Sequence, residues 1–76
     1  MYMVHDNLKK LVEEIEKQLA KEQVTTVWAI QKRTGKNVLS IYKAILVLLK
    51  QGKIDVEILP KSVIVIYRQK DQKEEK

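Results

Sequence analysis

The spacing of hydrophobic residues changes at Gly52, and this change limits the possible folds more than any other feature of the sequence. Before Gly52, apolar residues recur every three or four positions, which is typical of one face of an α-helix. After it, residues 54–59 (IDVEIL) alternate apolar and acidic side chains, and residues 63–68 (VIVIYR) are β-branched as far as Tyr67. Both patterns are typical of β-strands, and the PKS between them suits a turn. The sequence therefore predicts an α+β fold in which helices come first and a β-hairpin comes last.

Three helices are expected before the hairpin. The first is predicted to begin at Asp6 or Asn7, since either residue can cap a helix, and to run to residue 22. Its spacing places five apolar side chains on one stripe: Leu8, Leu11, Val12, Ile15 and Leu19. We interpret this helix as a packing element.

The second helix is expected to be about two turns long. Thr26 is a suitable N-cap, and Gly35 suits the left-handed residue that follows a helix C-terminus. Val27 and Ile30 are expected to face inward. Trp28 is interpreted as a residue of the core or of its edge, with a direct ligand contact as the alternative.

The third helix is expected to begin near Asn37 or Val38 and to end at Gly52. Its inward stripe is predicted to consist of Ile41, Ala44, Ile45 and Leu48. Two short helices joined through a glycine turn form a helix-turn-helix, whose second helix can enter the major groove of DNA.

The predicted architecture is a winged helix-turn-helix, with three helices followed by a β-hairpin wing. Residues 24–25 are expected to add a minimal third strand. Residues 1–68 are predicted to form one domain, and the polar residues 69–76 are expected to be disordered.

Positive charge gathers around the predicted turn. The chain carries a net charge of +5, and residues 23–54 contain no acid but six basic residues: Lys32, Arg33, Lys36, Lys43, Lys50 and Lys53. Such a segment favours a polyanion-binding surface over the mixed charges of an ordinary solvated face. A merely solubilising patch is the alternative.

Double-stranded DNA is the partner expected for this surface, with structured RNA as the alternative. Phosphate contacts are expected from Lys32, Arg33 and Lys36. Base-edge contacts are expected from Asn37, Ser40, Tyr42 and Lys43. Lys61 at the wing tip is expected to add a weaker contact.

The residue types offer little for catalysis. The sequence has no cysteine, one histidine (His5) and two glycines, so neither a thiolate metal site nor a glycine-rich phosphate loop can form. We expect no enzyme activity, no metal and no cofactor. No apolar run approaches the roughly 18 residues of a membrane span, and no signal-peptide pattern is present, so a cytoplasmic protein is expected.

The predicted third helix is apolar on nearly every side. Beyond its inward stripe it carries Leu46, Val47 and Leu49, and the last strand has no polar face either. This surplus favours a subunit interface, most simply that of a homodimer. The alternative is that the first helix and the hairpin cover most of it.

The segment from Thr26 to Tyr67 resembles the winged-helix superfamily. The likeness is carried by two stretches of sequence. The predicted second helix and its turn read TTVWAIQKRTG, and the predicted recognition helix and its exit read NVLSIYKAILVLLKQGKI. This resemblance implies the fold and, more weakly, a small transcription regulator of archaeal type.

A second resemblance is to the small-subunit ribosomal protein family numbered twenty-five. It is carried by Thr26, Ser40, the Leu48–Leu49 pair with Gly52, and the Ile66–Tyr67 pair. The recognition helix departs from that family at Tyr42–Lys43, as does the hairpin tip. This resemblance implies an RNA-binding protein, and a third hypothesis is a winged helix used only for protein contacts.

Overall fold

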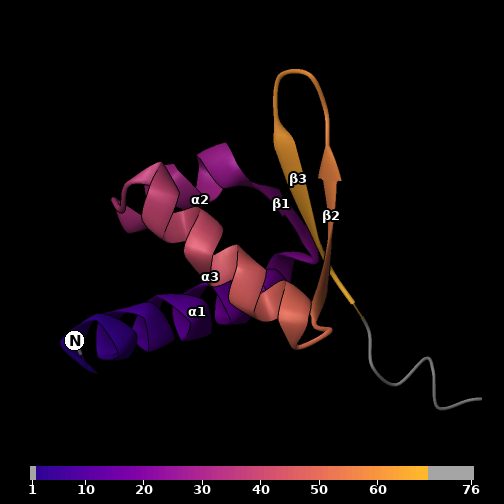
Figure 1. Cartoon of the computed structure of the whole chain (residues 1–76). Helices are drawn as coiled ribbons and strands as arrows, with labels where there is room; N and C mark the ends of the chain where they lie inside the picture. Colours follow the sequence, from indigo (N-terminus) through magenta and orange to yellow (C-terminus); the bar gives the residue numbers. More distant parts are fainter. Residues whose placement is uncertain (1, 69–76) are drawn as a thin grey trace, which may run out of the picture.

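The computed structural model describes residues 2–68. Its helices are α1 (Tyr2–Glu22), α2 (Val27–Thr34) and α3 (Val38–Lys50), and its strands are β1 (Val24–Thr26), β2 (Ile54–Ile58) and β3 (Val63–Tyr67). The helices pack together on one side, and the hairpin of β2 and β3 extends beyond them (Figure 1). The expected α+β architecture is therefore confirmed.

The sheet has three antiparallel strands in the order β1-β3-β2. β3 is central, with Val65 opposite Thr25 on one side and Val56 on the other. The third strand predicted at residues 24–25 is present and includes Thr26. β3 is therefore paired along both edges, whereas four of its side chains, Val63, Ile64, Ile66 and Tyr67, are only partly buried.

The first helix begins earlier than predicted. α1 starts at Tyr2, so Asp6 and Asn7 lie inside the helix and do not cap it. No glycine or proline interrupts the preceding residues, which allows the helix to propagate through Asp6. The helix ends at Gln23, which takes a left-handed conformation with φ of 71°.

The other predicted helix ends agree closely with the structure. Thr26 caps α2, since its hydroxyl accepts a hydrogen bond from the backbone N–H of Ala29 at 3.1 Å. α3 ends at Lys50, two residues before the expected Gly52, whose φ of 74° carries the chain out of the helix.

One hydrophobic core joins all three helices to the sheet. The stripe of α1 packs on that of α3, and Val27 and Ile30 of α2 are buried as predicted. The most fully buried large side chains are Ile15, Leu19, Ile30, Ile41, Leu48, Ile54 and Val65. The segment predicted to be disordered, residues 69–76, lies outside the described residues.

Candidate nucleic-acid interface

The turn between α2 and α3 is closed by backbone and side-chain hydrogen bonds. Gly35, with φ of 72°, donates its N–H to the carbonyl of Gln31 at 2.9 Å. Asn37 then caps α3, its Oδ1 accepting from the N–H of Ser40 at 2.9 Å. The exposed Lys36 lies between these two fixed points, directly before the start of α3.

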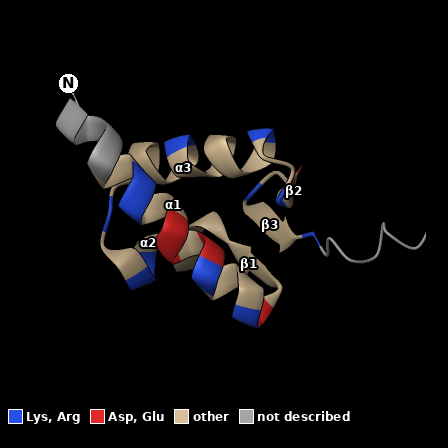
Figure 2. Cartoon of the chain, turned by 90° about the horizontal axis from the view of Figure 1, so that it is seen from below, with Lys and Arg blue, Asp and Glu red and all other residues tan. Residues whose placement is uncertain are grey.

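The outward face of α3 consists of four residues at alternating spacings of four and three, opposite the buried stripe: Leu39, Lys43, Leu46 and Lys50. Leu39 is 62% exposed and Leu46 is 58% exposed. In Figure 2 the charged segments of α3 are all basic, whereas α1 carries both signs. This face presents cations and apolar side chains to solvent, without a carboxylate.

Of the residues predicted to read base edges, Lys43 lies on this outward face, whereas Tyr42 and Ser40 lie on opposite sides of it. Tyr42 is 39% exposed and lines a groove toward the wing. Ser40 is partly buried and lies seven residues before Val47, so both occupy the flank of α3 that faces α1. The Oδ1 of Asn37 is committed to the helix cap, which leaves its amide nitrogen as the group that can donate to a base.

Part of the positive charge of residues 23–54 is compensated by carboxylates elsewhere in the fold. Arg33 donates through Nη2 to Glu22 of α1 at 3.1 Å, and Lys53 lies 3.2 Å from Glu16. Both carboxylates precede the segment in sequence, and the packing of α1 brings them close to its cations. Two of the six cations are therefore neutralised by α1.

Trp28 is not a core residue, contrary to the interpretation of the sequence. Its side chain is 65% exposed, and Nζ of Lys32 lies 4.7 Å from the centroid of the ring. The two residues are one helical turn apart on α2, so the ammonium rests over the aromatic face as a cation–π pair. Lys32 is thereby held on the outer surface of α2.

A groove of about 340 Å³ runs between α2, α3 and the wing. Its helical side is formed by Val27, Trp28, Gln31, Val38 and Tyr42. Its wing side is formed by Leu59, Pro60, Lys61, Ser62 and Val63. The groove was not foreseen, because the residues of its two sides are 17 to 36 positions apart in the sequence.

The wing tip is a short loop. The N–H of Leu59 donates to the carbonyl of Ser62 at 2.8 Å, closing the loop around Pro60 and Lys61. Lys61 is exposed and is the only cation of this loop. The wing therefore brings one positive charge to the groove.

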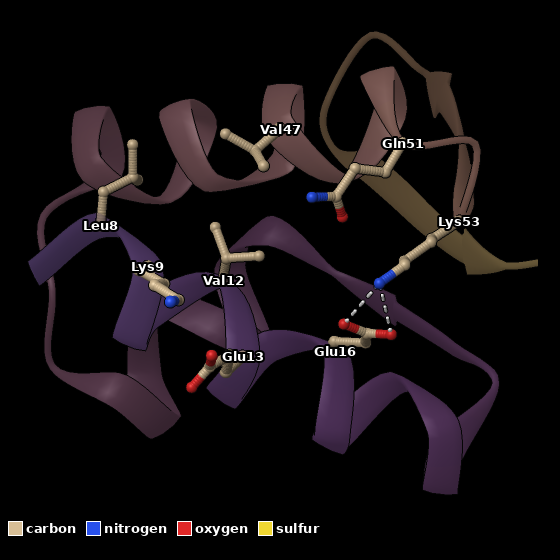
Figure 3. Close-up of a pocket in the computed structure, with 8 residues that line it drawn as sticks. All are labelled: Leu8, Lys9, Val12, Glu13, Glu16, Val47, Gln51 and Lys53. Carbon is tan, nitrogen blue, oxygen red and sulfur yellow. Dashed lines mark hydrogen bonds and ion pairs between the residues drawn. The ribbon is translucent and has the colours of Figure 1, made fainter. Parts of the chain in front are cut away.

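The three residues predicted for the dimer interface do not share one surface. Leu46 and Leu49 are exposed, whereas Val47 is partly buried against the core. Figure 3 shows Val47 facing Leu8 and Val12 across a groove of about 410 Å³ between α1 and α3. Of these three residues, only Leu46 and Leu49 are exposed enough to contact a second chain.

Among residues 7–68, whose side chains the structure describes, no cluster of three or more His, Cys, Asp or Glu residues could hold a metal ion. Of the helices described between residues 2 and 68, none combines the length and hydropathy that crossing a bilayer requires.

Comparison with known proteins returns a structural likeness. No protein-family model and no curated protein sequence matches the chain. A solved structure concerning the DNA recognition and protein interaction domains of HOP2, and its homologous DNA pairing properties, is similar with a TM-score of 0.64. The two chains are 21% identical over 76% of this chain and 98% of that chain. At this identity the likeness supports the fold, a winged helix, and not a particular function.

Proposed function

We propose that the protein binds double-stranded DNA by placing the N-terminal half of α3 in the major groove. One observation carries the proposal. Lys36 is exposed directly before α3, and Lys43 and Lys50 are exposed on the outward face of the helix, while no acidic residue occurs from residue 23 to residue 54. A recognition helix that must lie between two phosphate backbones needs this arrangement.

The likeness to a solved structure that concerns DNA recognition by HOP2 adds support at the level of the fold. The proposal differs from the sequence-based one in the phosphate contacts. Lys36, Lys43 and Lys50 carry most of the electrostatic attraction here, because Arg33 is shared with Glu22. Lys32 contributes from α2, and Lys61 contributes from the wing.

Sequence preference in this proposal comes from side chains near the start of α3. Leu39 offers apolar contact to thymine methyl groups, and Tyr42 and Lys43 offer hydrogen bonds to base edges. The amide nitrogen of Asn37 adds a donor at the same end of the helix. Such contacts suit a transcription regulator with a short preferred site.

Dimerisation would complete that role. A single recognition helix reads few base pairs, whereas two helices related by a two-fold axis read two half-sites about one DNA turn apart. Leu49 lies seven residues after Tyr42, on the flank of α3 and away from the outward face, and supplies exposed apolar surface for such a contact. Leu46 lies between Lys43 and Lys50 on the face that would meet the DNA. On this proposal the protein is a binding module and carries out no chemical step.

Binding measured against salt concentration tests the proposal. If at least three of these lysines contact phosphates, log K for duplex DNA should fall with log salt at a slope of about −3 or steeper. Duplex RNA of the same sequence serves as the comparison, because its narrow major groove excludes a helix. A flat salt dependence, or tighter binding to the RNA duplex, would contradict the proposal.

A further inference from the structure

The groove between α2, α3 and the wing exposes aromatic ring faces that duplex reading does not use. Trp28 is 65% exposed and Tyr42 is 39% exposed, and both line the groove. A duplex presents base edges in its grooves, so exposed aromatic ring faces add little to its recognition. A single strand presents the faces of its bases, and these stack on aromatic side chains.

We infer that this groove is a binding site for an unpaired base of single-stranded nucleic acid, stacked on the ring of Trp28. The inference rests on the proposed function and extends it to a second kind of substrate. The groove volume of about 340 Å³ lies at the small end of the range of ligand sites, which suits one planar ring and not a long ligand.

The charges around the groove complement a nucleic-acid backbone. Lys61 lines the wing side. Lys32 does not line the groove itself, but its Nζ lies 4.7 Å from the ring centroid of Trp28, which lines the helical side. Among the described residues that line the groove, none is a carboxylate. A strand whose base enters the groove therefore meets a cation on each side for its phosphates, as in single-strand binding sites generally.

The cation–π pair leaves room for stacking. One ammonium covers at most one face of the indole, and the ring is still largely exposed with Lys32 in place. Pro60 and Leu59 on the wing side present apolar surface toward the same groove. A base entering the groove would exchange water for aromatic and apolar contacts on both sides.

Trp28 is the only tryptophan of the chain, so its fluorescence reports directly on this site. We expect an unlabelled twelve-nucleotide deoxythymidine strand to quench the emission, because stacking places a base against the indole. A uridine strand of equal length distinguishes DNA from RNA as the source of the base. A blunt duplex of mixed sequence should bind with little quenching.

Affinity measured with a labelled strand provides the matched test. Trp28→Ala should weaken single-strand binding about tenfold or more, in line with the loss of one stacked base. Trp28→Phe should retain part of the affinity. Val24→Ala, which truncates an exposed apolar side chain on β1, should leave it unchanged.

The outcomes separate this inference from the proposed function. The inference would be overturned if neither single strand quenched the emission and Trp28→Ala bound the single strand as tightly as the unaltered protein. If the duplex still bound, the proposed function would stand. Failure to bind any nucleic acid would overturn both. Quenching by a single strand together with the loss in Trp28→Ala would establish the site.

Discussion

Arg33 of α2 donates to the carboxylate of Glu22 at the end of α1, with Nη2 and Oε2 3.1 Å apart. Both side chains are substantially exposed, so the pair contributes little to stability. We expect its larger effect to be on the proposed DNA binding, because the carboxylate offsets a cation beside the proposed DNA surface. Glu22 is thus placed to limit the affinity for phosphate.

Replacing Glu22 should therefore strengthen DNA binding. Glu22→Gln removes the partner charge and is expected to release Arg33 toward phosphate, steepening the salt slope by up to about 0.9 for one added contact. Fluorescence anisotropy at several salt concentrations measures this. Glu13→Gln on α1 is the control, since it changes the net charge equally and frees no guanidinium. Equal effects of both variants would contradict this role of the pair.

The left-handed conformation of Gly35 sets the geometry of the turn. Gly35→Ala is expected to lower the free energy of unfolding by about 1–2 kcal/mol, because an L side chain is disfavoured at positive φ. No atom lies within 4 Å of the position that a Cβ would take, so no steric clash adds to this cost. Urea denaturation measures the change. Gly35→Asn should cost less, because asparagine tolerates this conformation better.

The local signals in the sequence were sufficient for most of the fold. Caps and turns at Thr26, Gly35 and Asn37 depend on residues within a few positions, and so does the alternation of β2. The predicted start of α1 was wrong. Asp6 can cap a helix only if the residues before it are not helical, and here the helix already begins at Tyr2.

The candidate site was harder to predict, because its contacts are made across the fold. The residues near Arg33 in the sequence do not indicate that the packing of α1 places Glu22 beside it as an ion-pair partner. The helical spacing of α2 does place Trp28 outside the stripe of Val27 and Ile30. The interpretation as a core residue relied on its hydrophobicity and is wrong.

The wing should contribute less to binding than the turn. Lys61 is a single exposed cation on a short loop, so Lys61→Ala is expected to weaken duplex binding by under about 1 kcal/mol. Lys36→Ala should cost more, because Lys36 adjoins the start of α3. The two variants are compared by anisotropy on the same duplex. Complete loss of binding in Lys61→Ala would instead make the wing a main contact.

A homodimer is expected in solution through the exposed Leu49 of α3. A buried leucine is worth roughly 1.5–3 kcal/mol, so Leu49→Lys should give a folded monomer. Val47→Gln should instead lower stability, because Val47 packs against the core. Light scattering gives the mass of each variant. A mass equal to one chain for the unaltered protein would rule the dimer out.

The most direct test of the central claim is a charge reversal on the face of α3. Lys36→Glu with Lys43→Glu should abolish duplex binding at moderate salt, because these residues lie against the phosphates in the proposed complex. Lys10→Glu with Lys17→Glu, on α1 beside Tyr67, changes the net charge equally and should retain most of the affinity. Anisotropy on one labelled duplex compares the two variants. An equal loss in both, or no loss in the α3 variant, would contradict DNA binding through α3.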